Sequence, residues 1–223
     1  MSSANSDNLD VHSGHQVYTP KLLRWYDLLV HGISNRWFWG CPTQLLEAWF
    51  DEHATDNHLD IGVGTGFFPD RCSVFSADAR IGLFDANLDC LTAAEKRLAR
   101  FQPEVIQANL ADPLVTLTEP FTSVSLMYVL HCLPGEQAFR QRVLQHASSA
   151  LVANGTLFGA TILGKPSPRS WLGRHVMASY NRQGIFGNEH DTQASLKVVL
   201  ETCLVDVAIE QVGSVALFAG RKN

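Results

Sequence analysis

The residues that decide the fold are Asp60-Ile61-Gly62-Val63-Gly64-Thr65-Gly66, which overlap and follow the short apolar stretch His58 to Ile61. Glycine adopts positive φ angles and lets the backbone approach a ligand closely. In open α/β sheets, ligands bind beyond the carboxyl ends of the strands, where the N-terminus of the next helix also points. The stretch therefore predicts a nucleotide or nucleoside site at the end of a first strand. The competing interpretation is a tight strand-to-helix turn without a ligand.

Two residues beside the glycines indicate the kind of ligand. A dinucleotide fingerprint reads GxGxxG, but Phe67 stands where its last glycine would be. Asp60 lies two residues before Gly62, where a carboxylate would repel a pyrophosphate and attract the ammonium group of an amino acid. We therefore expect a nucleoside that carries an amino-acid group.

Two further segments are candidates for holding such a nucleoside. Asp85, followed by Ala86, ends a predicted second strand, where an acid accepts hydrogen bonds from ribose hydroxyls in nucleotide-binding α/β folds. The alternative is a helix N-cap at Asp85 or Asn87. After the third strand, Asn109 offers an amide to the edge of an adenine and Leu110 offers cover for its face. The alternative there is an ordinary polar loop.

Apolar strands and amphipathic helices alternate along the rest of the chain, which predicts a doubly wound, mostly parallel sheet of the α/β class. A hairpin across Val212-Gly213-Ser214 would add an antiparallel strand at the end of the chain. The predicted strands are 58–61, 80–84, 104–107, 123–130, 156–163, 204–210 and 215–219, and the predicted helices are 42–50, 88–101, 137–151 and 195–202, with a turn at Asn154-Gly155.

The pattern divides the chain into three parts. We expect a disordered tail over residues 1–16, a helical cap over 17–56 and a cofactor-binding α/β domain over 57–223. Residues 164–191 do not fit the alternation and contain Pro, Trp and Tyr. We interpret them as a lid-like insertion in the α/β domain.

Composition excludes several classes of partner. The 223 residues carry a net charge of −5, and 46 % of them are hydrophobic, as in a globular protein. No run of Lys or Arg suggests nucleic acid or an anionic membrane as a partner, and no apolar run reaches the ~20 residues that span a bilayer. The five cysteines form no CxxC pair, so we expect no disulfide framework, no metal and a cytoplasmic location. The oligomeric state stays open.

The order DxGxGxG, an acid ending the second strand and a polar loop after the third resembles class I S-adenosyl-methionine-dependent methyltransferases, in particular the ubiquinone-biosynthesis-type and small-molecule enzymes. The segment Met127 to Gly135 resembles their fourth motif, and Asn154-Gly155-Thr156-Leu157 resembles a later one, with Asn in place of one glycine. The likeness covers residues 57–163 well.

The resemblance implies seven strands in the order 3-2-1-4-5-7-6 and S-adenosyl-L-methionine as the cofactor. It also implies a role for each matching residue: Asp60, Gly62, Gly64 and Gly66 at the methionine moiety, Asp85 and Ala86 at the ribose, Asn109 and Leu110 at the adenine, Val129 within the fourth motif, and Tyr26 in a covering cap. The sequence Leu130-His131-Cys132-Leu133 replaces the Asn/Asp-Pro-Pro-Tyr/Phe motif of enzymes that methylate nucleobases. That difference favours a small-molecule acceptor over nucleic acid.

His131 is the candidate general base, because it follows an apolar strand and imidazole titrates near neutrality. The alternative is a strand-end residue that contacts the cofactor by its backbone. Candidate acceptor contacts are Tyr18, Trp37, Trp171, Tyr180 and Asn181.

These residues together predict methyl transfer to the oxygen or nitrogen of a small, moderately apolar molecule. One alternative is a protein of this fold that isomerises, dehydrates or cyclises a small molecule without methylating it. A non-catalytic binding module and a nicotinamide oxidoreductase are further alternatives.

Overall fold

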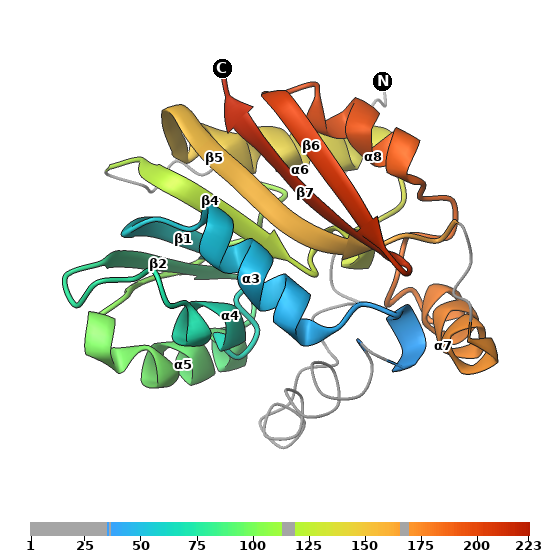
Figure 1. The fold of residues 1–223 in the computed structure, drawn as a ribbon, viewed down its shortest axis with the longest axis horizontal. Coiled ribbons are helices and arrows are strands. Elements are labelled where there is room, and N and C mark those ends of the chain that lie inside the picture. Colours follow the sequence, from blue (N-terminus) through green and yellow to red (C-terminus); the bar gives the residue numbers. More distant parts are fainter. Residues whose placement is uncertain (1–34, 36, 113–118, 166–169) are drawn as a thin grey trace, which may run out of the picture.

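A computed structural model of the chain describes residues 35, 37–112, 119–165 and 170–223 (Figure 1). Within them lies a seven-stranded sheet in the order β3-β2-β1-β4-β5-β7-β6, which confirms the predicted order. β3, β2, β1, β4 and β5 run parallel to one another, whereas β7 is antiparallel to both β5 and β6. The strands are β1 (Asn57–Ile61), β2 (Arg80–Asp85), β3 (Glu104–Gln107), β4 (Phe121–Met127), β5 (Leu151–Ile162), β6 (Leu204–Val212) and β7 (Val215–Lys222).

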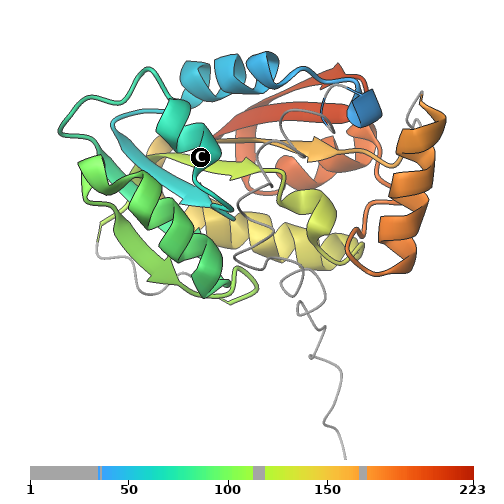
Figure 2. The ribbon, with the colours of Figure 1, turned by 90° about the horizontal axis from the view of Figure 1, so that it is seen from below.

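Helices cover both faces of the sheet (Figure 2). On one face lie α3 (Thr43–His53), α4 (Phe67–Arg71) and α5 (Leu88–Arg97), and on the other lie α6 (Gln137–Ser149) and α8 (Gln193–Leu200). Phe50 and Phe158 fill the space between α3 and the sheet, and Val143 and Leu200 belong to the cluster on the opposite face. The helix α7 (Trp171–Arg182) stands beside the sheet at the end where β4 and β5 finish.

The end of β4 differs from the prediction. The apolar run suggested a strand to Leu130, but β4 ends at Met127 and Leu130–Cys132 forms a single 3₁₀ turn, η3. Tyr128 adopts a φ of 62°, a left-handed conformation that turns the chain out of the strand. This strain sits at the carboxyl edge of the sheet, where strained residues often mark functional sites.

The predicted turn at Asn154-Gly155 is also wrong. β5 begins at Leu151 and runs through both residues, with Asn154 at a φ of 61°. The pairing with β4 is irregular here, because Phe121 pairs with Leu151 whereas Ser123 already pairs with Thr156. Asn154 therefore lies in a bulge of a continuous strand.

Other predicted boundaries shift by a few residues. The helix that begins at Leu88 ends at Arg97 and a 3₁₀ turn, η2 (Ala99–Phe101), follows it. The hairpin across Gly213 is confirmed, with a φ of 61° at that glycine. The insertion contains α7, and α4 directly follows the glycine loop; the sequence predicted neither helix.

The predicted tail, Tyr18 and Tyr26 lie outside the described residues, as does most of the predicted cap. The described part of the cap includes α3, which begins one residue after Pro42 and continues to His53. No helix in the described part of the chain is long and apolar enough to cross a membrane.

Candidate functional site

The glycine loop joins β1 to α4. All three of its glycines adopt a positive φ, which disfavours other residues: 72° at Gly62, 51° at Gly64 and 71° at Gly66. The N–H of Gly62 donates to the carbonyl of Phe84 at 2.8 Å, which ties the loop to β2. A β-carbon on Gly62 would lie 2.4 Å from Cγ2 of Val129. The predicted residue Val129 therefore packs against the loop, so the ends of β1 and β4 meet there.

Asp60 lies near the end of β1 and is 4 % exposed. The hydroxyl of Ser125 donates to its Oδ1 at 2.5 Å. Burial raises the pKa of Asp60 to about 7. The hydrogen bond from Ser125 lowers this pKa, and the negative charge of Asp85 raises it, but both effects are smaller than that of burial. Because the charges of Asp60 and Asp85 destabilise each other, a cationic group between the two strand ends would be stabilised.

Asp85 ends β2, and its Oδ1 accepts a hydrogen bond from the N–H of Asn87 at 2.9 Å. The side chain of Asn87 accepts hydrogen bonds from the N–H groups of Asp89 and Cys90. Asn87, not Asp85, is therefore the N-cap of α5. Of the two residues that the alternative interpretation offered as the N-cap, Asn87 has that role and Asp85 does not.

The loop after β3 lies beside Asp85, since the N–H of Ala108 donates to the carbonyl of Asp85 at 3.2 Å. Asn109 Oδ1 accepts a hydrogen bond from the N–H of Ala111 at 2.9 Å, which shapes the loop. Leu110 is 8 % exposed, and its side chain belongs to the core cluster that contains Phe84. The residues predicted for ribose and adenine thus come from adjacent strand ends.

These groups fit an amino-acid-bearing nucleoside. A backbone loop that a β-carbon would obstruct lies between a buried acid, Asp60, and a second acid, Asp85. An ammonium group would relieve the repulsion between the two acids, whereas a pyrophosphate would add to it.

His131 lies in η3 and is 4 % exposed. Its Nδ1 accepts a long hydrogen bond of 3.4 Å from the N–H of Ile162 and also lies 3.4 Å from the hydroxyl of Thr161. Burial, with the positive charge of Arg140, lowers the pKa of His131 to about 3. The ring is therefore neutral at pH 7 and is a weak base, so proton transfer to it is unfavourable in this arrangement.

Aromatic side chains connect His131 with the insertion. The ring of His131 lies 5.7 Å from that of Tyr128 and 4.6 Å from that of Phe186, and Phe186 lies 5.0 Å from Tyr180. The N–H of Gly187 donates to the carbonyl of His131 at 2.9 Å. We call Tyr128, His131, Phe186 and Tyr180 the aromatic row. Tyr128 was not among the predicted site residues. The feature that marks it in the structure is its positive φ, which the sequence pattern did not indicate.

Trp37, Trp171 and Asn181 are the other predicted acceptor residues that the structure describes. Trp37 and Trp171 are 68 % and 66 % exposed. The amide nitrogen of Asn181 donates to the carbonyl of Met177 and to Oδ1 of Asn188, each at 3.0 Å. Both amide hydrogens of Asn181 are thus used inside the protein, and its predicted contact with an acceptor would need its carbonyl oxygen.

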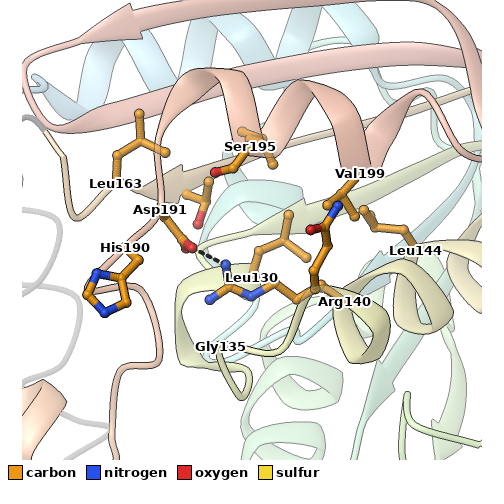
Figure 3. A pocket seen from close by; sticks show the side chains of 12 residues that line it. Leu130, Gly135, Arg140, Leu144, Leu163, His190, Asp191, Ser195 and Val199 are labelled. Carbon is orange, nitrogen blue, oxygen red and sulfur yellow. Dashed lines mark hydrogen bonds and ion pairs between the residues drawn. The ribbon is translucent and has the colours of Figure 1, made fainter.

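A cavity of about 180 Å³ lies between α6, α8, the turn η3 and the end of β5 (Figure 3). An ion pair between Arg140 and Asp191 crosses it. Leu130 lines the cavity and belongs to the cluster under α6 and α8, whereas the next residue, His131, contacts Phe186. The turn η3 therefore separates this cavity from the aromatic row, and none of the predicted site residues is among those that line it.

Known proteins resemble this chain over most of its length. A putative uncharacterised protein of Escherichia coli K12, YbcY, is 39 % identical over 84 % of this chain and 97 % of its own. Demethylluteothin O-methyltransferase of Streptomyces thioluteus is 33 % identical over 88 % and 86 %. The physcion biosynthesis cluster O-methyltransferase of Aspergillus chevalieri is 33 % identical over 94 % and 95 %. No family model matches the chain.

Solved structures share the fold at lower identity. The N-methyltransferase NodS of Bradyrhizobium japonicum, in complex with S-adenosyl-L-homocysteine, has a TM-score of 0.57 at 17 % identity, over 81 % of this chain and 84 % of its own. Human N-acetylserotonin methyltransferase in complex with SAM has a TM-score of 0.65 at 16 % identity, over 98 % of this chain and 60 % of its own.

The strand order, the glycine loop with its two acids and the relatives above 30 % identity agree with one another. The chain belongs to the class I S-adenosyl-methionine-dependent methyltransferases and is an enzyme that uses S-adenosyl-L-methionine as its cofactor.

Proposed function

We propose that the enzyme transfers the methyl group to a hydroxyl oxygen of a small, moderately apolar molecule. The observation that carries this proposal is the 33 % identity with Demethylluteothin O-methyltransferase over 88 % of the chain. The aromatic row supports it, because aromatic side chains at the carboxyl ends of strands suit a largely apolar acceptor.

Each strand end has a separate part in cofactor binding in this proposal. Asp60 and the loop from Gly62 to Gly66 hold the methionine moiety, Asp85 with Ala86 binds the ribose, and Asn109 with Leu110 meets the adenine. Val129 fixes the loop from the β4 side. The bound cofactor supplies an activated methyl group on a sulfonium.

The reaction forms one O–CH₃ bond as one S–CH₃ bond breaks, and the acceptor hydroxyl loses its proton. The protein therefore has to align the two partners and exclude water. Tyr18, Trp37, Trp171, Tyr180 and Asn181 stay proposed acceptor contacts. Among them Tyr180 has the strongest support, since Phe186 connects its ring to that of His131.

His131 stays the candidate base, with a condition that its surroundings impose. A ring whose pKa is near 3 accepts a proton only when a neighbouring group stabilises the imidazolium. An acceptor that leaves a phenolate beside Tyr128 and His131 needs such a base least, because phenols are more acidic than alcohols. We therefore propose a phenolic or enolic hydroxyl as the acceptor.

A protein that isomerises or cyclises its substrate without methylating it has no support from the two relatives of the chain that are named for an activity, because both are O-methyltransferases. The experiment that tests the proposal incubates the protein with methyl-labelled cofactor and paired acceptors that share one aromatic skeleton, one with a hydroxyl and one with an amine. Label in the hydroxyl compound alone supports O-methylation. Label in the amine alone, or in neither although S-adenosyl-L-homocysteine binds, overturns it.

A further inference from the structure

Four buried polar side chains stand in two registered pairs across β1 and β4. His58 pairs with Ser123, and Asp60 pairs with Ser125. Their residues are between 0 % and 4 % exposed. Neighbouring residues of a registered pair point to the same face of a sheet, so all four side chains lie on one face.

Hydrogen bonds join these side chains into one line. Ser123 Oγ lies 2.8 Å from Nδ1 of His58, and Nε2 of His58 lies 3.0 Å from Ser125 Oγ. Ser125 then donates to Asp60 at 2.5 Å. At the opposite end, the N–H of Thr55 donates to Ser123 Oγ at 3.0 Å, and the hydroxyl of Thr55 lies 2.9 Å from it. The line thus runs from half-buried Thr55 to the carboxyl group at the predicted cofactor site.

Aromatic rings surround the middle of this line. The imidazole of His58 lies 5.2 Å from the ring of Phe50, 5.5 Å from that of Phe75 and 5.8 Å from that of Phe158. Burial in this environment lowers the pKa of His58 to about 3. The imidazole is therefore neutral, with one donor and one acceptor nitrogen, and which nitrogen carries the hydrogen depends on its two serine partners.

The neutral ring gives the line a direction. When Asp60 is ionised, it accepts from Ser125, which then accepts from Nε2–H of His58, while Nδ1 accepts from Ser123. When Asp60 is protonated and donates to Ser125, every donor and acceptor along the line exchanges roles, and the hydrogen of His58 moves to Nδ1. Packing alone does not require such a line, since apolar residues of similar size would fill the same space.

We propose that His58 is a positioning residue for the cofactor: through Ser125 it orients the carboxyl group of Asp60, and the line of hydrogen bonds reverses when Asp60 gains or loses a proton. This inference rests on the proposed role of Asp60 in binding the cofactor. When Asp60 gains a proton, each group passes one hydrogen toward Asp60 and Thr55 takes up one proton from the solution. When Asp60 loses the proton, the same transfers run in the opposite direction and Thr55 releases one proton to the solution. The groups that face Asp60 are Ser125 from β4, Asp85 from β2 and, along its own strand, His58 through Ser125.

Nitrogen-15 NMR of the histidine side chains measures the tautomer of His58 directly, with His58→Gln identifying its signals. We expect the Nε2–H form above pH 8 and with S-adenosyl-L-homocysteine bound, and a growing share of the Nδ1–H form as the pH of the free protein falls to 5.5. In Ser125→Ala this response should disappear. One unchanging tautomer in the wild-type protein, bound and free, would overturn the inference.

Calorimetric titration with S-adenosyl-L-homocysteine between pH 5.5 and 9 provides the second readout. Since the hydrogen bond from Ser125 lowers the pKa of Asp60, Ser125→Ala should move the midpoint of the affinity profile up by about one pH unit and weaken binding at pH 7 roughly fivefold. Ser148→Ala is the matched control, because it removes another buried serine hydroxyl, which donates to the carbonyl of Gln145 on α6.

The two proposals fail in different ways. A wild-type protein that does not bind S-adenosyl-L-homocysteine contradicts the proposed function and this inference together. A wild-type protein that binds it, with Ser125→Ala showing the wild-type pH profile, contradicts only the role of His58 and Ser125. If His58 had only a structural role, His58→Gln would change the stability of the fold without moving the midpoint of the profile of S-adenosyl-L-homocysteine affinity against pH.

Discussion

Gly62 and Val129 are in such close contact that a β-carbon on the glycine would lie 2.4 Å from Cγ2 of the valine. The contact joins the loop after β1 to the first residues after β4, where Tyr128 has a φ of 62°. Any movement of one strand end is therefore transmitted to the other. In the proposed reaction these two ends hold the donor and the acceptor respectively.

Gly62→Ala should destabilise the fold by about 1 to 3 kcal/mol and weaken binding of S-adenosyl-L-homocysteine, because the new methyl group meets Val129 and the φ of 72° disfavours alanine. Gly64→Ala is the matched control for stability, since its φ is also positive but no atom lies within 4 Å of its β-carbon. Urea unfolding and calorimetry measure both effects. If the contact is the cause, adding Val129→Ala restores part of the lost stability; equal losses in both glycine variants would argue against it.

Asp85→Ala should weaken binding of S-adenosyl-L-homocysteine by about ten- to a hundredfold, because hydrogen bonds to a charged group contribute about 1.5 to 3 kcal/mol. α5 should stay intact, since Asn87 is its N-cap. Asp78→Ala removes an exposed acid before β2 and serves as the control. Calorimetry and circular dichroism together check the prediction, which is wrong if both variants bind alike.

Acidification should destabilise the folded protein through His58 and His131. Both have a pKa near 3 in the folded state and about 6.5 when unfolded, so between these values the unfolded chain binds more protons. Stability should fall as pH decreases from about 6.5 toward 3, by about 1.4 kcal/mol per pH unit for each group. Asp60 acts in the opposite direction, because its pKa is raised to about 7 and its stabilisation by protonation grows below that pH.

Urea unfolding of the wild-type protein and of His58→Gln, between pH 4.5 and 7, isolates one histidine. The free energy of unfolding of the variant should depend less steeply on pH, because its unfolding takes up about one proton fewer than that of the wild-type protein. Equal slopes would mean that His58 is protonated in the folded protein.

The alternation of strands and helices was enough to predict a mostly parallel sheet and the hairpin across Gly213, because each segment carries its own apolar pattern. The strand order was predicted by the resemblance to class I methyltransferases, and the structure confirms it. The end of β4 escaped prediction, since Met127 to Leu130 is apolar throughout and only the φ of Tyr128 ends the strand. The local sequence is compatible with either an extended or a left-handed conformation of Tyr128.

Hydrogen bonds between residues far apart in the chain could not be predicted from the sequence either. Asn181 resembles a polar surface residue of a helix, yet its amide donates to buried Asn188, whose own amide donates to the carbonyl of Ile162 at 2.8 Å. The line from His58 to Asp60 depends on the register of β1 against β4, which no pattern within either strand specifies.

His131→Gln distinguishes a base from a residue that only packs. If His131 accepts the proton of the acceptor, kcat should fall by about a hundredfold or more while the affinity for S-adenosyl-L-homocysteine stays near the wild-type value. His53→Gln on α3 is the control, since its Nδ1 pairs with the carbonyl of Trp49, which is not a predicted site residue. Steady-state kinetics at several pH values measures the split, and an unchanged kcat leaves His131 a structural role beside Phe186.

The central claim is that the methyl group of the cofactor reaches the oxygen of a small, moderately apolar acceptor. The most direct measurement supplies cofactor with a carbon-13 methyl group and phenolic acceptors, and identifies the product by carbon-13 NMR and mass spectrometry. We expect an aryl methoxy signal in the product, one equivalent of S-adenosyl-L-homocysteine for each product, and loss of both in Asp60→Ala. A labelled methyl group on nitrogen or carbon, or an altered acceptor without label, would contradict it.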